Sequence, residues 1–294
     1  MNTAPTTVAF VGLGAMGFPM AGHLSQQYAT RVYNRNRDKA QAWLQQFSGV
    51  ACQTPAEAAA NSDAIFMCVG NDDDVRTVVY GDDGVLAGMR AGSLLIDHTT
   101  VSAELARELY RVCRKRHIQF LDAPVSGGQA GAENGQLTIM VGGDTQAYAQ
   151  AEPIMDAYAK RIKHMGPCGA GQLTKMANQI CIAGVVQGLS EALHFSHKAG
   201  LDGRAVVEAI SQGAAQSWQM ENRHNTMIDG EFDFGFAVDW MRKDLDIALR
   251  TASANGASLP LTALVDQFYA DVQNMGGGRW DTSSLIQRLR RLDG

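Results

Sequence analysis

The glycine-rich segment near the start of the chain constrains the fold most. A β-rich apolar run at residues 8–11 ends at Gly12, and a helical pattern runs from about Met16 to about Gln27. The turn between them reads Gly12-Leu13-Gly14-Ala15-Met16-Gly17. A turn that holds a pyrophosphate needs these three glycines for the tight turn, for close approach of the backbone, and for packing of the helix on the strand. The segment predicts a dinucleotide-binding turn whose amides receive phosphate, with a tight turn that binds nothing as the alternative.

The rest of the chain predicts two domains. Apolar runs at residues 31–33, 64–69, 93–97, 119–122 and 138–141 alternate with helical patterns, and the last of these runs closes the series. Such alternation predicts a parallel sheet with right-handed crossovers. One long helix is expected over residues 170–199, followed by helices near 204–212, 236–254 and 260–274. The expected fold is therefore an α/β Rossmann-type domain over residues 1–167, joined by a long interdomain helix to an all-α domain over 168–294.

The end of the second predicted strand indicates the choice of cofactor. An acidic residue at this place would bind the ribose 2′-hydroxyl of NAD, but the sequence reads Asn34-Arg35-Asn36-Arg37. Arg35 can offer a planar, charged fork to a 2′-phosphate, and Arg37 can add to it. We expect NADP as the cofactor, with NAD as the other possibility. The alternative is a pair of solvent-facing arginines in a turn.

A second candidate site combines a loop with a helix. Ser126, Gly127 and Gly128 follow the strand near residue 120 and offer a hydroxyl and unobstructed amides to a carboxylate. Lys175 and Asn178 are three residues apart in the long predicted helix, so they share a face. A lysine beside a cofactor can give a proton to a developing alkoxide or take one from an alcohol. Taken alone, the loop could be only rigid and the lysine only a solvated surface charge.

Four motifs in register resemble the β-hydroxyacid dehydrogenase family, which includes 3-hydroxyisobutyrate dehydrogenase and the tartronate semialdehyde and glyoxylate/succinic semialdehyde reductases. They are the glycine-rich turn, the loop at residues 122–128, the segment 169–172 with Lys175 and Asn178, and Lys243-Asp244-Leu245. The resemblance spans residues 7 to about 288. It implies that Lys175 is the catalytic acid/base and that Asn178 helps to orient the substrate oxygen. Ser126, Gly127 and Gly128 would bind the substrate carboxylate. It also implies that Val69, Thr100 and Lys243 contact the cofactor.

The resemblance implies a reaction and an assembly as well. The reaction is hydride transfer between nicotinamide and a small β-hydroxyacid or semialdehyde, in the class of NAD(P)-dependent dehydrogenases that act on CH–OH groups. The assembly is a homodimer or homotetramer. The sequence departs from the usual pattern at Gly70, where many members have proline, at Gln179, where many have asparagine, and at Thr99, where many have serine. Each departure can change substrate preference.

Charge and composition exclude other classes of protein. The formal net charge is −5, and the basic runs at residues 111–116 and 288–291 are short and typical of solvated helix faces, so we expect no nucleic-acid partner. No apolar stretch reaches the roughly 18 residues that span a bilayer, and residues 1–7 have no signal-peptide pattern. The five cysteines are odd in number and scattered, which favours reduced thiols. We expect a cytoplasmic protein with no membrane partner.

Three weaker alternatives stay open. Glu191, His194 and His197 share a helical face, but no second cluster supports a metal site, so we expect none. The segment 217–222 could line the substrate pocket or simply belong to a core. The chain could also be an imine or larger sugar-acid reductase of the same architecture, or a nucleotide-binding protein without catalysis.

Overall fold

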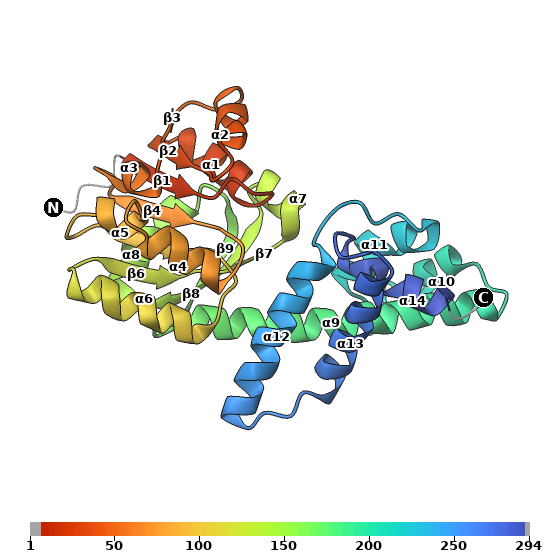
Figure 1. Ribbon diagram of the computed structural model, residues 1–294. Helices are drawn as coiled ribbons and strands as arrows, with labels where there is room; N and C mark the ends of the chain where they lie inside the picture. The colour runs from red at the N-terminus through yellow and green to blue at the C-terminus, as the bar shows by residue number, and fades with distance from the viewer. Residues whose placement is uncertain (1–6, 292–294) are drawn as a thin grey trace. The chain divides into compact units, whose positions relative to one another are not determined.

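The computed structural model describes residues 7–291 of the chain (Figure 1). The chain divides into two compact units, one that ends at Lys175 and one that begins at Met176. A continuous helix, α9 (Ala170–Lys198), runs from the first unit into the second. The domain boundary near residue 168 therefore stays a prediction.

The first unit is built on one sheet, in the order β3-β2-β1-β4-β5-β6-β8-β7, with β9 paired to β8. The strands are β1 (Thr7–Val11), β2 (Ala29–Tyr33), β3 (Val50–Ala51), β4 (Ala64–Met67), β5 (Leu94–Asp97), β6 (Gln119–Asp122), β7 (Val125–Ser126), β8 (Leu137–Gly143) and β9 (Ala159–Gly166). The strands from β3 to β6 are all paired in parallel. The order reverses between β1 and β4, which is the topological switch point where doubly wound sheets bind nucleotides.

The far end of the sheet corrects two expectations. β8 runs antiparallel to both β6 and β7, so the sheet is mixed rather than purely parallel. The connection from β7 to β8 holds only the short helix α7 (Gly128–Glu133), and so short a link returns the chain antiparallel. The series also does not close at β8, because β9 follows and pairs parallel to it. The sequence of β9, AKRIKHMG, is polar and half exposed, so it carries no apolar run.

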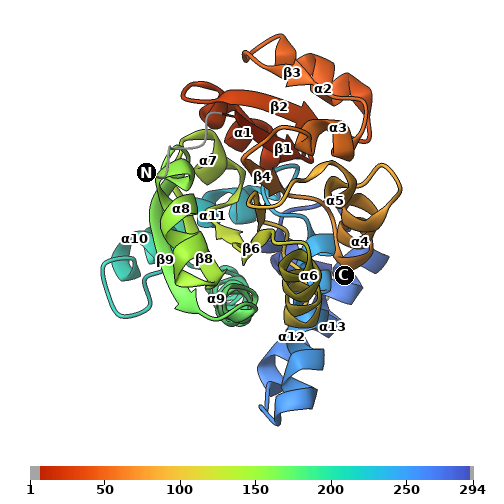
Figure 2. The same ribbon diagram turned by 90° about the vertical axis from the view of Figure 1, so that its left-hand side faces the viewer.

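Helices cover both faces of this sheet (Figure 2). Alternate residues of β1 enter different cores: Val8 and Phe10 one, Ala9 and Val11 the other. The first core packs against α1 (Gly17–Ser25), α2 (Arg37–Leu44), α7 and α8 (Thr145–Met155). The second packs against α3 (Pro55–Ala59), α4 (Asp72–Tyr80), α5 (Val85–Gly88) and α6 (Ala103–Lys115). Burial on both faces explains why these strands read as continuous apolar runs.

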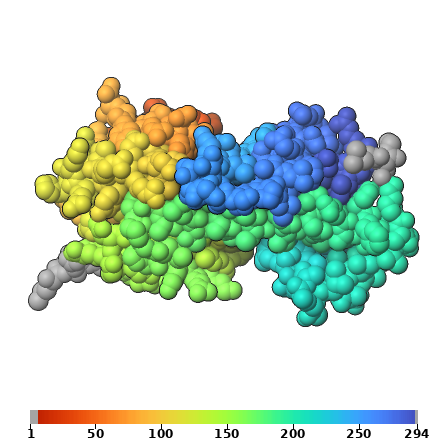
Figure 3. Space-filling model, turned by 90° about the horizontal axis from the view of Figure 1, so that it is seen from below, coloured from red at the N-terminus to blue at the C-terminus, as the bar shows by residue number. Residues whose placement is uncertain are grey.

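The basic run at residues 111–116 belongs to the end of α6. Arg111, Arg114, Lys115 and Arg116 are exposed, while Cys113 is buried in the core. Figure 3 shows α6 (yellow) at the surface. The basic side chains therefore face solvent, while the opposite side of the helix packs on the sheet.

The described part of the second unit contains helices and, apart from one isolated bridge between Ala237 and Asp281, no β-structure. It contains the rest of α9, then α10 (Gly203–Ile210), α11 (Trp218–Asp229), α12 (Val238–Asn255), α13 (Pro260–Asn274), the 3-10 turn η1 (Thr282–Ser284) and α14 (Leu285–Arg291). The predicted fold class is thus confirmed. The segment 217–222 begins α11, where Ser217 caps the helix and Met220 is buried. In residues 7–291 no helix is both long and apolar enough to cross a membrane.

Candidate cofactor and substrate sites

The three glycines of the first motif have three different surroundings. Gly12 has a φ of +97°, and a Cβ there would collide with the Cys68 carbonyl. A Cβ on Gly17 would collide with the Gly12 carbonyl and lie 2.8 Å from the Phe10 ring. A Cβ on Gly14 would meet no protein atom within 4 Å. The first glycine therefore makes the turn and the third lets α1 pack closely, while the second leaves open space where a pyrophosphate can approach the backbone.

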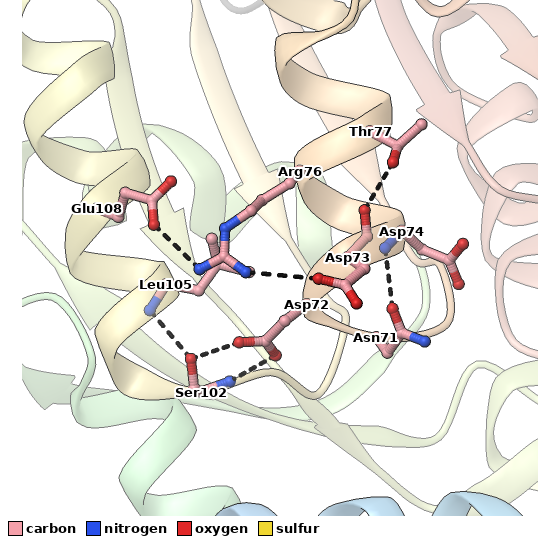
Figure 4. A network of polar contacts seen from close by, with 9 residues as sticks. All are labelled: Asn71, Asp72, Asp73, Asp74, Arg76, Thr77, Ser102, Leu105 and Glu108. Atoms are coloured by element: carbon pink, nitrogen blue, oxygen red, sulfur yellow. Dashed lines mark hydrogen bonds and ion pairs between the residues drawn. The ribbon is translucent and has the colours of Figure 1, made fainter.

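The loops after β4 and β5 lie against each other at the same end of the sheet. The Val69 amide donates to Thr99 Oγ1 at 3.0 Å, and the Val69 side chain lies beside Gly12. Asp72 accepts hydrogen bonds from the backbone amide and hydroxyl of Ser102, the N-cap of α6 (Figure 4). Thr100, half buried, lies between these contacts. The structure thus brings Val69 and the Thr99–Thr100 loop to the switch point.

The turn after β2 is fastened to the glycine-rich turn. Asn34 Oδ1 accepts the Leu13 amide at 2.8 Å, and Asn34 Nδ2 donates to the Asn36 carbonyl at 2.9 Å. The Arg35 side chain is 90% exposed, and its guanidinium lies 3.5 Å from the Asp74 carboxylate. Arg37 is the exposed first residue of α2. Asn34 therefore holds the turn, and Arg35 is the charged group that reaches out beside it.

The predicted carboxylate loop bends sharply after a short strand. Ser126 ends β7 opposite Thr138 of β8. Gly127 and Gly128 follow with φ of +134° and +63°, which other residues rarely adopt. No protein atom lies within 4 Å of the place of a Gly128 Cβ. The loop therefore presents its backbone without side-chain obstruction.

Lys175 lies in α9 and is only 8% exposed. It is therefore not the solvated surface lysine that the sequence left as an alternative. A lysine side chain is rarely so buried unless its charge is paired with another group.

Within the second unit, Asn178 and Lys243 are linked by a chain of polar contacts. Asn178 Nδ2 donates to Gln179 Oε1 at 2.8 Å, and Gln179 Nε2 donates to Asp244 Oδ2 at 2.6 Å. The other oxygen of Asp244 lies 3.2 Å from Lys243 Nζ. Gln179 and Asp244 are each 1% exposed. The motif pattern contains both residues, but only the structure reveals that they connect the two predicted site residues.

Two buried titratable residues, Asp97 and His98, lie at the end of β5. Asp97 Oδ1 accepts the Thr99 amide at 2.8 Å, and burial raises the pKa of Asp97 to about 7. His98 Nδ1 lies 2.6 Å from the Ala123 carbonyl, and Nε2 lies 2.9 Å from the Tyr158 hydroxyl. Burial lowers the pKa of His98 to about 4, so the ring is neutral. A carbonyl can only accept, so Nδ1 carries the proton and Nε2 accepts from Tyr158.

Glu191 shares a face of α9 with His194 and His197. Glu191 Oε1 accepts a hydrogen bond from Gln187 Nε2 at 2.6 Å. Among residues 7–291, no three His, Cys, Asp or Glu side chains gather as metal ligands would.

The sheet order and the three glycine environments are those of a dinucleotide-binding domain, and the family matches place the chain among the NAD(P)-dependent oxidoreductases. Residues 7–166 match the sequence profile of the NAD binding domain of 6-phosphogluconate dehydrogenase. Residues 169–289 match the profile described as NAD-binding of NADP-dependent 3-hydroxyisobutyrate dehydrogenase. The chain belongs to the β-hydroxyacid dehydrogenase family.

Relatives match over nearly their whole length. A protein of Shewanella frigidimarina named as an uncharacterized oxidoreductase is 60% identical over 285 residues, covering 97% of this chain and 98% of that protein. The 2-hydroxy-3-oxopropionate reductase of Escherichia coli is 34% identical, covering 97% of each chain. The structure of Mycobacterium tuberculosis 3-hydroxyisobutyrate dehydrogenase with L-serine is similar with a TM-score of 0.87 at 31% identity, covering 97% of this chain and 99% of that one. The chain is thus similar to dehydrogenases and reductases that act on hydroxyl or carbonyl groups.

Proposed function

We propose that the protein is an NADP-dependent reductase of small semialdehydes that bear a carboxylate, and that it also catalyses the reverse oxidation of the β-hydroxyacid. The observation that carries the proposal is the burial of Lys175, which is 8% exposed on a helix that begins beside the cofactor loops. Such a lysine is suited to proton transfer at a reacting oxygen rather than to solvation.

NADP as the cofactor is supported by the residues after β2. Asn34 uses its side chain on Leu13 and Asn36, and no acidic residue takes the place that would bind a ribose 2′-hydroxyl. Arg35, exposed at the same turn, is free of steric cover and suits a 2′-phosphate. Residues 12–17, Val69 and Thr100 would hold the rest of the cofactor, and Arg37 and Lys243 would add positive charge. When bound, the cofactor supplies the hydride.

The chain's own residues would then handle the substrate. The Ser126 hydroxyl and the amides of Gly127 and Gly128 hold the carboxylate, which fixes the distance of the carbonyl from that anchor. Lys175 Nζ donates a proton to the carbonyl oxygen as negative charge develops there, and takes it back in the oxidation. Asn178, already donating one N–H to Gln179, uses its second N–H to orient the same oxygen.

The names of the relatives indicate substrates of this size. We propose 3-hydroxyisobutyrate or the hydroxyacid partner of 2-hydroxy-3-oxopropionate as the model substrates for this chain, on the strength of the enzymes named for them. We also propose a homodimer or homotetramer, which light scattering on the purified protein would measure. A cytoplasmic location is proposed because all five cysteines are free thiols.

The test is a panel of NADPH oxidation assays. Glyoxylate, succinic semialdehyde, methylmalonate semialdehyde and tartronate semialdehyde are each offered with NADPH and then with NADH. We expect turnover of at least one semialdehyde, with the higher kcat/KM for NADPH. Turnover of a cyclic imine and of none of the four aldehydes would contradict the proposed reaction, and equal or better use of NADH would contradict the proposed cofactor.

A further inference from the structure

The side chain of Gln172 binds the backbone on both sides of Thr100. Its Nε2 donates to the Thr99 carbonyl at 2.8 Å, and its Oε1 accepts the Val101 amide at 3.1 Å. Gln172 is completely buried, and both partners belong to the loop after β5. One amide group therefore fixes the two peptide groups that flank the proposed cofactor residue.

The backbone of Gln172 is held by a second loop. Asp122, the last residue of β6, accepts the Gly169 amide at 2.7 Å and the Gln172 amide at 2.9 Å, so its carboxylate caps the start of α9. The loop that follows Asp122 leads to Ser126 and its two glycines. The first turn of α9 is thus fastened to the cofactor loop by a side chain and to the substrate loop by its own amides.

Two glycines allow this close approach. A Cβ on Gly171 would lie 2.6 Å from the Asp122 carbonyl oxygen, and a Cβ on Gly142 of β8 would lie 2.5 Å from the Asp122 carboxylate. Real Cβ atoms do not come so near a polar oxygen, so any larger residue at either place would push α9 away from the end of the sheet. The start of α9 is therefore packed closely against the end of the sheet.

We propose that Gln172 is a positioning residue of the reaction, which sets the place of Lys175 relative to Thr100. The inference rests on the proposed function, because it gives those two residues their roles. Lys175 follows Gln172 by three residues, about 4.5 Å along the helix axis, and an α-helix transmits that placement rigidly. A shift of about 1 Å in such a group can cost on the order of 100-fold in rate.

Glutamine suits this place because it donates and accepts at once. Methionine has similar length and does neither, so the Thr99 carbonyl and the Val101 amide would lose their partners. An ionised glutamate can accept from Val101 but cannot donate to Thr99. The glutamate carboxylate would also lie near two buried carboxyls, Asp97 and Asp122. It would be one helical turn from Lys175 as well.

The test compares two buried glutamines of the same helix. Gln172→Met is the test variant, and Gln187→Met is the matched control, because Gln187 is 5% exposed and donates only to Glu191. Both should lose some thermal stability. We expect Gln172→Met alone to lower kcat by about 10- to 100-fold, to weaken NADPH binding, and to raise the deuterium isotope effect on hydride transfer. Equal kcat and equal NADPH affinity in the two variants would overturn the inference.

A second variant gives a readout that loss of stability does not produce. Gln172→Glu should approach wild-type kcat at low pH, where the carboxyl is protonated and can donate to Thr99, and should lose activity as the pH rises. A pH profile parallel to that of the wild type would contradict the positioning role. If the wild-type protein reduces none of the panel substrates, the proposed reaction fails by itself. The affinity of Gln172→Met for NADPH, measured by fluorescence, then still decides whether Gln172 positions the cofactor loop.

Discussion

The side-chain oxygen of Asn34 accepts the backbone N–H of Leu13 across 2.8 Å, which joins the end of β2 to the glycine-rich turn. In an NAD-binding sheet an acidic residue at this place would receive the adenosine ribose. In this protein the Asn34 side chain forms hydrogen bonds with the backbone of Leu13 and Asn36 instead. The charge that a cofactor would meet comes from the next residue, Arg35, whose guanidinium is exposed.

The first prediction follows from that exposure. Arg35→Ala should weaken NADPH binding by about 10- to 100-fold, because a charge-assisted hydrogen bond to a phosphate contributes roughly 1.5–3 kcal/mol. NADH, which has no 2′-phosphate, should bind almost as before. Titration of each cofactor by fluorescence measures both effects. A parallel loss for NADH would mean that Arg35 stabilises the turn rather than reads the phosphate, and Arg37→Ala tests whether the second arginine contributes.

Asp74 should limit the affinity for NADPH. Its carboxylate lies 3.5 Å from the Arg35 guanidinium and would face a phosphate of the same sign. Asp74→Asn should therefore tighten NADPH binding about threefold, the size expected of an exposed charge pair, and the gain should shrink at high salt. The control is Asp73→Asn, one residue earlier, whose side chain is 95% exposed and pairs with Arg76 (Figure 4). No gain in Asp74→Asn, or an equal gain in the control, would contradict the prediction.

Gly14 and Gly17 should respond differently to the same substitution. Gly14→Ala should keep the free energy of unfolding within about 0.5 kcal/mol of the wild type, because a Cβ there meets no protein atom within 4 Å. It should nevertheless weaken NADPH binding, since the methyl group enters the space for the pyrophosphate. Gly17→Ala should cost about 1–3 kcal/mol or more by overpacking α1 against the turn. Urea unfolding and cofactor titration separate the two outcomes, and similar loss of stability in both variants would refute the division of roles.

Lys175→Ala should abolish most turnover and leave the cofactor site intact. A positioned general acid contributes about 100- to 10,000-fold, and kcat should fall by that range. The affinity for NADPH should change by no more than about twofold, as expected when an interaction made only in the transition state is removed. Lys115→Ala, at an exposed lysine of α6, is the control and should match the wild type in both measurements. Near-normal turnover of Lys175→Ala would reject the assignment of the acid/base.

The sequence predicted those parts of the molecule that depend on near neighbours. The β1–turn–α1 unit, the parallel character of the four pairings from β2 to β6, and the length of α9 all follow from local patterns. The two-residue strand β3 was not among the predicted strands. β9 could not be predicted, because a half-exposed strand of alternating polar residues resembles a loop. The reversal of β8 depends on pairing across the sheet, which periodicity does not report.

The contacts that organise the candidate site are distant in sequence. Gln172 binds Thr99 and Val101 across more than 70 residues, and Asp122 binds the start of α9 across about 50. The need for glycine at Gly142 is not visible in the sequence, because it arises only once Asp122 lies against β8. The sequence therefore identified candidate residues, while the reasons for several residue types are visible only in the contacts of the folded chain.

The last prediction concerns the pH dependence of stability. The adjacent buried residues Asp97 and His98 affect this dependence in opposite directions. Burial raises the pKa of Asp97 from 3.8 to about 7, so between these values the folded protein keeps a proton that the unfolded chain has released. This carboxyl therefore lowers stability as the pH rises through that window. Burial lowers the pKa of His98 from 6.5 to about 4, so below pH 6.5 the unfolded chain binds a proton that the folded protein does not. His98 therefore lowers stability as the pH falls.

In the wild type these two effects, each on the order of 3 kcal/mol, should largely cancel between about pH 4 and pH 6.5. His98→Asn keeps a donor for the Ala123 carbonyl and removes the titrating ring, so the effect of Asp97 should become visible. Urea midpoints of this variant should fall more steeply with rising pH across that window than those of the wild type, in which His98 offsets the effect of Asp97. His23→Asn, at a half-buried histidine of α1 that bonds the Ala132 carbonyl, should follow the wild type. A His98→Asn profile that also follows the wild type would show that the two buried groups do not carry the opposing protons assigned to them.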